Sequence, residues 1–217
     1  MRTHVLSAVA TVLLAVAPSP AVSQAARSPE ALARAVEQRY AGIRDFSADF
    51  TQVYRGVLLT ESRELGTLVI KKPGRLRLVY TDPDPKEIVS DGQKIYAYVP
   101  ADQMVNVQDV PTGDEAPTAD LFLSGKGDIV TDFTPAIVEG PVAGTIGLEL
   151  TPVRREADFE RLVLAVDPDT LQIRGYTTFD TQGGQSAIRF DNLRENTGIE
   201  DGYFHFQIPR GVDVQFN

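Results

Sequence analysis

The sequence contains no cysteine and no tryptophan, and its only histidines are His4 and His205. Without cysteine the chain can form no disulfide bond, can offer no thiolate nucleophile and can carry no lipid on a processed N-terminal cysteine. His205 alternates with two phenylalanines, which indicates a solvent-facing strand residue and not a general base. A G-x-S-x-G elbow is also missing. A hydrolase that uses only carboxylates stays open as an alternative.

Metal and phosphate motifs are missing as well. The pairs Asp82/Asp84 and Asp167/Asp169 each enclose a proline, and neither continues with the spacing of an EF-hand loop. Both pairs are therefore interpreted as turns. The short stretch 125–127 (GKG) lacks the length of a phosphate-binding loop. We expect no metal and no cofactor.

The charge is strongly one-sided. The chain has 30 acidic and 21 basic residues and a formal net charge of −9 at pH 7. Nucleic acids and anionic bilayer surfaces repel such a chain, so neither is expected as a partner. The acidity is sufficiently explained by solubility.

Long apolar runs are confined to the N-terminus. The run Val5–Ala17 follows a short basic start, and the small residues Ala21 and Ser23 fit a signal-peptidase site. The run is shorter than the about 20 apolar residues that span a bilayer. We expect residues 1–23 to be a signal peptide and residues 24–217 to form one exported domain. An uncleaved anchor is the alternative.

Hydrophobic periodicity predicts a mainly β chain with two helical pieces. Ser28 as N-cap and Pro29 at the first helical position predict a helix that stops at Gly42. A second short helix is expected within residues 116–125. Alternation with period two predicts about ten to twelve antiparallel strands, at residues 46–54, 64–71, 75–80, 86–90, 94–99, 103–110, 133–139, 145–152, 159–166, 172–179, 186–193 and 204–209.

Many short strands with dense turn residues are typical of a sandwich or barrel. Each early strand has one strongly apolar face, and two helices are available beside the sheet. The helices could complete an ordinary core, or they could form a removable lid over a cavity. Periodicity alone does not distinguish these two arrangements.

Four segments, taken in order, resemble the LolA family of lipoprotein carriers. Together they span residues 46–214, which is nearly all of the chain after the expected signal peptide. They read FSADFTQ at residues 46–52, GTLVIKKPG at 66–74, VSDGQKIYAY at 89–98 and FHFQIPRGVDV at 204–214. Each motif is weak alone, and the ordered set is fairly specific.

The resemblance implies a mainly β (α+β) fold, an incomplete and strongly curved antiparallel β-barrel of about 10–12 strands with a helical lid over an apolar cavity. It implies a periplasmic chaperone, not an enzyme, that works as a monomer. Its partners would be acylated lipoproteins, an inner-membrane ABC lipoprotein-release complex and an outer-membrane lipoprotein receptor. The residues expected to line the cavity are Phe46, Phe50, Tyr54, Leu68, Ile70, Leu76, Leu78, Tyr80 and Tyr96, with Leu121 and Phe122 from the lid helix.

The resemblance also implies a lock on the lid. In the family, a basic residue just before a proline bonds to the lid backbone and holds the empty form closed. The matching residue is Lys72, where the best-known members carry arginine, and Arg75 is expected to compensate. Lysine presents a compact charge instead of a planar fork of donors, so the strength of closure is where this chain departs from the family.

Three other interpretations each require a different feature of the sequence or the fold. The related receptor LolB is itself a lipoprotein, which the absence of cysteine disfavours. A periplasmic stress-sensing regulator of the same fold needs an additional domain. A structural or adhesion module predicts no apolar cavity.

Overall fold

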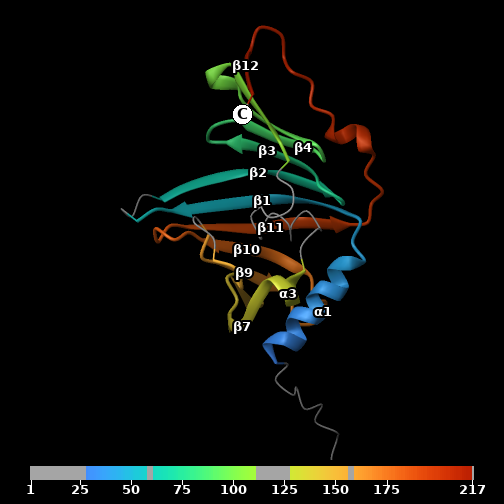
Figure 1. The fold of residues 1–217 in the computed structure, drawn as a ribbon, viewed down its shortest axis with the longest axis vertical. Coiled ribbons are helices and arrows are strands. Elements are labelled where there is room, and N and C mark those ends of the chain that lie inside the picture. Colours follow the sequence, from blue (N-terminus) through green and yellow to red (C-terminus); the bar gives the residue numbers. More distant parts are fainter. Residues whose placement is uncertain (1–27, 58–60, 111–127, 156–158, 217) are drawn as a thin grey trace, which may run out of the picture.

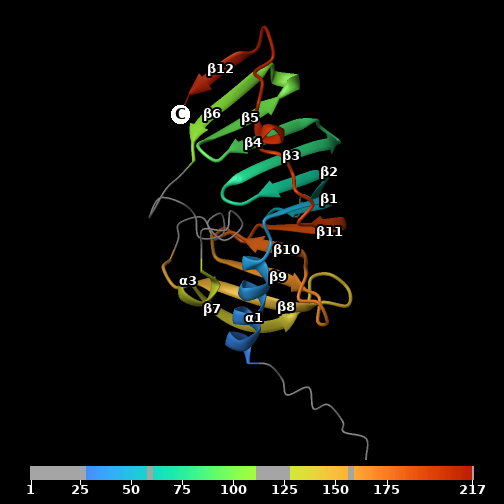
Figure 2. The ribbon, with the colours of Figure 1, turned by 90° about the vertical axis from the view of Figure 1, so that its right-hand side faces the viewer.

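The structure is a computed structural model, and it describes residues 28–57, 61–110, 128–155 and 159–216. These residues form one open, curved sheet of 12 strands with little helix (Figures 1 and 2). The strand order is β12-β6-β5-β4-β3-β2-β1-β11-β10-β9-β8-β7. This agrees with the mainly β, incomplete barrel that the resemblance implies.

Most helices and strands lie close to the residue ranges that the sequence predicts. The helices are α1 (Pro29–Ala41), η1 (Pro100–Asp102), α3 (Ile129–Asp132) and η3 (Asp201–Phe204). The strands are β1 (Asp45–Arg55), β2 (Glu61–Lys71), β3 (Arg75–Asp82), β4 (Lys86–Asp91), β5 (Lys94–Val99), β6 (Met104–Asp109), β7 (Phe133–Glu139), β8 (Ile146–Pro152), β9 (Arg161–Val166), β10 (Ile173–Phe179), β11 (Gln185–Glu195) and β12 (Asp213–Phe216).

The sheet consists of two meanders joined at one pair of strands. Strands β1 to β6 pair in sequence order and form the first meander, and β7 to β11 form the second. Antiparallel pairing of β1 with β11 connects the two, with Phe50 opposite Phe190. Each meander can therefore be built from neighbours in the chain, because hairpins bring consecutive strands together.

Helix α1 begins and ends where its sequence predicts. The Ser28 hydroxyl accepts from the backbone N–H of Ala31 at 3.2 Å, proline occupies the first turn, and the helix ends before Gly42. Its buried side includes Leu32, Val36 and Tyr40. That side packs against β7, β8 and the short helix α3 (Figure 2). The face of the sheet that α1 covers is called the inner face below.

Two expectations from the sequence are wrong, and one short helix is additional to those expected. Residues 204–209 are not a strand, because Phe204 ends η3 and an irregular segment follows. The last strand is instead β12, and it pairs in parallel with β6, so the sheet is not antiparallel throughout. Helix α3 was not expected, and the Glu37 carboxylate of α1 accepts from its Ile129 N–H at 2.8 Å. The helix expected within residues 116–125, with Leu121 and Phe122, lies outside the described residues, as do residues 1–27.

The outer face carries a second apolar cluster. Val89, Val105 and Val107 are buried there beneath Phe206 of the C-terminal segment. Lys71 and Arg75 form ion pairs with Asp201 of η3 and hold this segment against the sheet. The C-terminal segment thus covers the outer face of β4 to β6.

Candidate functional site

Strand register brings most of the expected cavity residues onto the inner face of the first meander. One row across the sheet joins Phe46, Ile70 and Leu76, because each is the direct partner of the next. The following row joins Ala48, Leu68, Leu78 and Ile88, and the third joins Phe50, Gly66 and Tyr80. Successive residues of a strand point to opposite faces, so these three rows form one continuous apolar surface.

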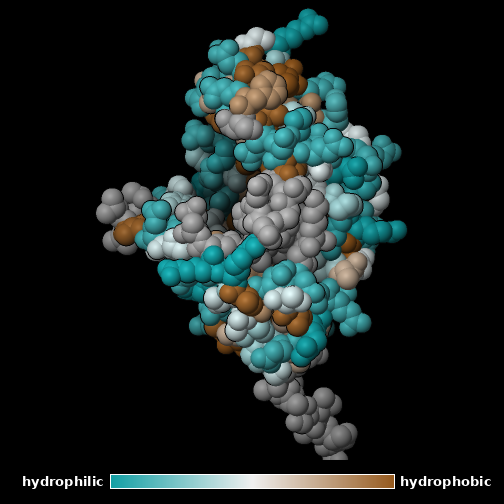
Figure 3. All heavy atoms as spheres, viewed as in Figure 1, coloured by the Kyte–Doolittle hydropathy of each residue, from teal (hydrophilic) through white to brown (hydrophobic). Residues whose placement is uncertain are grey.

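Burial decreases across this surface. Phe46, Phe50, Leu68, Ile70 and Tyr80 are buried in the main core. Further from β1, Leu76, Leu78 and Ile88 are only half-buried, although they pack against the same core. The apolar inner face therefore opens toward β3, β4 and β5. Figure 3 looks onto this side of the molecule, whose surface is hollowed beneath the β6 end of the sheet.

A glycine allows two aromatic rings to lie against the sheet in the third row. The rings of Phe50 and Tyr80 meet edge to face, with centroids 5.1 Å apart. Phe50 lies over Gly66, where an added Cβ would stand 2.7 Å from the Phe50 ring. Such a contact is shorter than van der Waals packing permits, so the rings depend on the missing side chain.

Lys72 lies between the first row and the C-terminal end of α1. Its ammonium donates to the Tyr40 carbonyl oxygen at 2.6 Å and stands 3.5 Å from the centre of the Tyr40 ring. A cation is favoured at a helix C-terminus and over an aromatic face. Burial lowers the pKa of Lys72 to about 8. The residue that the resemblance assigns to the lid lock thus contacts the backbone of α1.

Arg75 points the other way. Leu76 faces inward, so Arg75 faces outward, and its guanidinium pairs with Asp201 at 3.4 Å. Its charge is directed to the C-terminal segment, not to α1. Alternation along β3 makes this orientation unavoidable once Leu76 is on the inner face.

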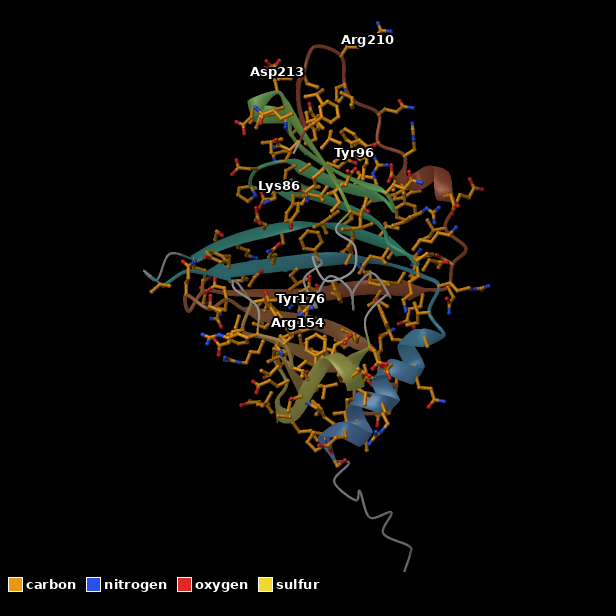
Figure 4. The ribbon with its side chains drawn as sticks, in the orientation of Figure 1. Lys86, Tyr96, Arg154, Tyr176, Arg210 and Asp213 are labelled. Atoms are coloured by element: carbon orange, nitrogen blue, oxygen red, sulfur yellow. The ribbon has the colours of Figure 1, made fainter. Side chains whose placement is uncertain are left out.

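Tyr96 faces outward, so it does not line the inner face as the resemblance implies. Its partner in β4 is Val89, whereas Ile88 and Ser90 lie on the inner face. Its ring stacks on Phe206 of the outer cluster with centroids 5.3 Å apart, close to the C-terminal segment in Figure 4. Tyr54 shares the inner-face alternation of β1, but it is 42% exposed at the far end of the strand. Sequence reasoning also missed Ile88, which alternation within residues 86–90 could have identified.

The remaining sequence candidates have ordinary roles. The Asp167 carboxylate accepts from the N–H of Asp169 and of Thr170, which confirms a turn and lowers the pKa of Asp167. His205 is exposed between buried Phe204 and Phe206. Among the described residues, no group of three or more His, Cys, Asp or Glu side chains could hold a metal ion. None of their helices is long and apolar enough to cross a membrane.

A comparison with known protein families assigns a family to a chain with this apolar inner face and this basic residue at α1. Residues 41–207 match the family described as "Outer membrane lipoprotein carrier protein LolA". The chain belongs to the LolA family. The LolA match covers the last residue of α1, strands β1 to β11 and the segment that follows them through Gln207.

Individual relatives agree with this LolA assignment. The outer-membrane lipoprotein carrier protein of Chromohalobacter salexigens is 32% identical over 176 residues, which cover 79% of this chain and 80% of that protein. The protein of the same name from Legionella pneumophila (strain Corby) is 28% identical over 183 residues, 84% of this chain and 88% of its own. A crystal structure of an uncharacterized conserved protein from Thermus thermophilus shares the fold, with a TM-score of 0.53, 10% identity and coverage of 85% of this chain and 99% of that one.

Proposed function

We propose that this protein is a periplasmic chaperone that carries lipoproteins by holding their acyl chains. The observation that supports this most directly is the inner face of the first meander. The row from buried Ala48 and Leu68 to half-buried Leu78 and Ile88 contains no charged residue. An apolar surface of this kind in a water-facing protein marks a binding site for an apolar ligand.

The energetics explain why such a carrier is needed. Each methylene group gains about 0.8 kcal/mol when it leaves water, so a chain of roughly fifteen methylenes is held in a bilayer by about 12 kcal/mol. An acylated protein therefore does not cross an aqueous compartment unaided. A protein surface lined by Leu76, Leu78 and Ile88 offers the chain an environment comparable to the one it left.

Lys72 supplies a contact that can hold the empty form closed. Its bond to the Tyr40 carbonyl joins the end of β2 to the end of α1. Cargo that enters beneath α1 would separate these elements and break the bond. The ammonium is partly desolvated, so the contact stabilises closure only modestly, and modest closure suits a carrier that must open.

The remaining parts of the proposal concern place and partners. Residues 1–23 direct export and residues 24–217 are the carrier domain, which acts in the periplasm as a monomer and catalyses no reaction. An inner-membrane ABC lipoprotein-release complex supplies the cargo, and an outer-membrane lipoprotein receptor accepts it. Family membership supports the carrier role, and the names of the relatives support the outer membrane as destination.

The test is release of lipoproteins from spheroplasts. Purified residues 24–217 are incubated with spheroplasts of the host that carry labelled lipoproteins, and the soluble fraction is examined for a one-to-one complex. We expect release by the native chain and strong loss with Leu76→Glu, because a buried carboxylate opposes the apolar chains. Thr67→Glu is the matched control, since Thr67 is exposed on the outer face of β2. Absence of release with an active transporter would sink the carrier proposal.

A further inference from the structure

A chain of polar side chains crosses the inner face at the end of the strands furthest from α1. The Tyr80 hydroxyl donates to Gln52 Oε1 at 2.9 Å, and Gln52 Nε2 donates to Ser186 Oγ at 2.8 Å. Beside them, the Lys86 ammonium pairs with Glu64 at 2.6 Å and stands 4.1 Å from the centre of the Tyr80 ring. These five residues, here called the polar strip, come from β11, β1, β2, β3 and β4.

The polar strip bounds the apolar rows on one side. Along β1, Phe46, Ala48 and Phe50 face inward, and the next inward residue is Gln52. The distance along the strand from Phe46 to Gln52 is about 20 Å, close to the length of an extended palmitoyl chain. The inner face therefore presents hydrocarbon-like surface near α1 and hydrogen-bonding groups at the opposite end, where Figure 4 shows Lys86.

The polar strip has donors that its internal bonds do not use. Within the described part of the chain, the Lys86 ammonium donates only to Glu64, which leaves two of its three protons for another acceptor. Gln52 Nε2 likewise uses one of its two N–H bonds on Ser186. All five residues are half-buried or buried, with the Lys86 and Glu64 side chains 31% and 21% exposed. Water competes poorly there, so an acceptor that reaches these donors gains more than it would on the surface.

We propose that the polar strip binds the ester carbonyl oxygens that link acyl chains to the glyceryl group of a lipoprotein, while the hydrocarbon lies along the apolar rows toward α1. The inference rests on the proposed carrier function and adds a direction to it. Ester carbonyls accept hydrogen bonds and donate none, and they lose their bonds to water when the chains enter the cavity. The unused N–H donors of Lys86 and Gln52 replace those bonds, the Tyr80 hydroxyl holds the Gln52 amide in place, and the polypeptide leaves at the strip end.

The test compares two lipopeptides that differ only in those oxygens. One carries ester-linked palmitoyl chains on its S-glyceryl cysteine, and the other carries ether-linked alkyl chains of equal length. The purified protein should bind the ester form about 3- to 10-fold more tightly, the range of one net hydrogen bond. Equal affinity of the native protein for both would overturn the proposal, whereas failure to bind either would overturn the carrier function itself.

Two variants place the preference in the polar strip. Tyr80→Phe keeps the ring packed on Phe50 but removes the hydroxyl that orients the Gln52 amide, and the double variant Glu64→Gln, Lys86→Met removes the ion pair without leaving a lone charge. Each should lower affinity for the ester lipopeptide about 3- to 10-fold and leave the ether form within about twofold. Thermal unfolding checks that the variants fold, and Tyr98→Phe, on the outer face beside Phe206, is the matched control. Equal loss of both ligands in a folded variant would contradict the assignment.

Phospholipids also carry glyceryl esters, so a further arm separates the two sources. A dipalmitoyl phospholipid is added as a competitor to the bound ester lipopeptide. We expect the lipopeptide to be retained, because its third chain and its polypeptide add contacts that the phospholipid lacks. Displacement at equal concentration would overturn the assignment to acylated polypeptides.

Discussion

The two meanders present the same alternation of apolar residues on the inner face, but they bury it to different extents. In the second meander Leu148, Leu150, Leu162 and Leu164 are each 0% exposed. In the first meander, the inward leucines of β3 and Ile88 of β4 stay half-buried. Helices α1 and α3 contact β7 of the second meander. What covers the sheet, and not the strand pattern, separates the fully buried core from the half-buried surface that we propose binds acyl chains.

Under the proposed function, this difference shows how a single sheet can serve both as a core and as a binding surface. A strand with one apolar face satisfies folding whether that face meets a helix or a ligand. The second meander and α1, together with the inner side chains of β1 and β2, supply the packed core that fixes the fold. The first meander is then free to keep apolar surface uncommitted, at a cost in stability that the packed half offsets.

The most direct test of this difference in packing is to truncate one inward leucine to alanine in each meander. Leu164→Ala should lower the free energy of unfolding by about 2–5 kcal/mol, because it leaves a cavity in a close-packed core. Leu78→Ala should cost less than about half as much, since part of its side chain is already open to solvent. Urea unfolding followed by circular dichroism measures both. Equal losses would show that the two halves are packed alike.

A smaller effect is expected at Gly66, where the first meander is tightly packed. Gly66→Ala places a methyl group against the Phe50 ring and the Val79 carbonyl. We expect a loss of about 1–3 kcal/mol in unfolding free energy, together with weaker binding of acylated cargo. The control is Thr67→Ala on the outer face of the same strand. An unchanged melting temperature would contradict the packing of Phe50 over this glycine.

The outer cluster around Phe206 should affect stability but not cargo binding, in contrast to the inner rows. Phe206→Leu removes the stacking with Tyr96 and should destabilise the protein by about 1 kcal/mol. Cargo release should stay unchanged, because Phe206 lies on the face opposite the inner rows. Release from spheroplasts and thermal unfolding are measured on the same preparation. Loss of release without loss of stability would mean that the outer face takes part in transfer.

The last effect is a pH dependence at Lys72. Its pKa is about 8 in the folded protein and 10.5 ordinarily, so the unfolded state binds more protons between these values. The contribution of Lys72 to the free energy of unfolding should therefore rise from about pH 8 to about pH 10.5 and stay constant below. Urea unfolding of the native chain and of Lys72→Met across this range gives the difference. Lys72→Arg, which keeps its charge, should abolish the rise. A difference that stays flat would show that the amine is solvated.

Local signals were enough to predict much of the fold. Ser28 and Pro29 fix the start of α1 because capping acts within one turn. The strands of both meanders follow from alternation, which depends only on which residues are apolar. The same alternation correctly placed Phe46, Phe50, Leu68 and Ile70 on one face, and the register makes them neighbours.

The predictions that failed depend on contacts between segments, which the sequence of a single strand does not contain. Phe204 and Phe206 alternate like strand residues, but they are buried by docking onto the outer face without forming a ladder with it. The face of Tyr96 depends on the register that two successive turns impose between β3, β4 and β5. The polar strip could not be predicted from the sequence, because Gln52 and Ser186 meet only through the pairing of β1 with β11.

That same pairing sets the order in which the molecule can assemble. Gln52 and Ser186 are 134 positions apart in the sequence, whereas every other antiparallel pair joins consecutive strands. Closing so long a loop is entropically costly and slow compared with forming hairpins. We expect the seam between β1 and β11 to form late in refolding, so the inner face becomes continuous only when the chain is nearly complete. During synthesis, the first meander therefore exists for a time without its packed partner, when its apolar rows are most exposed to aggregation.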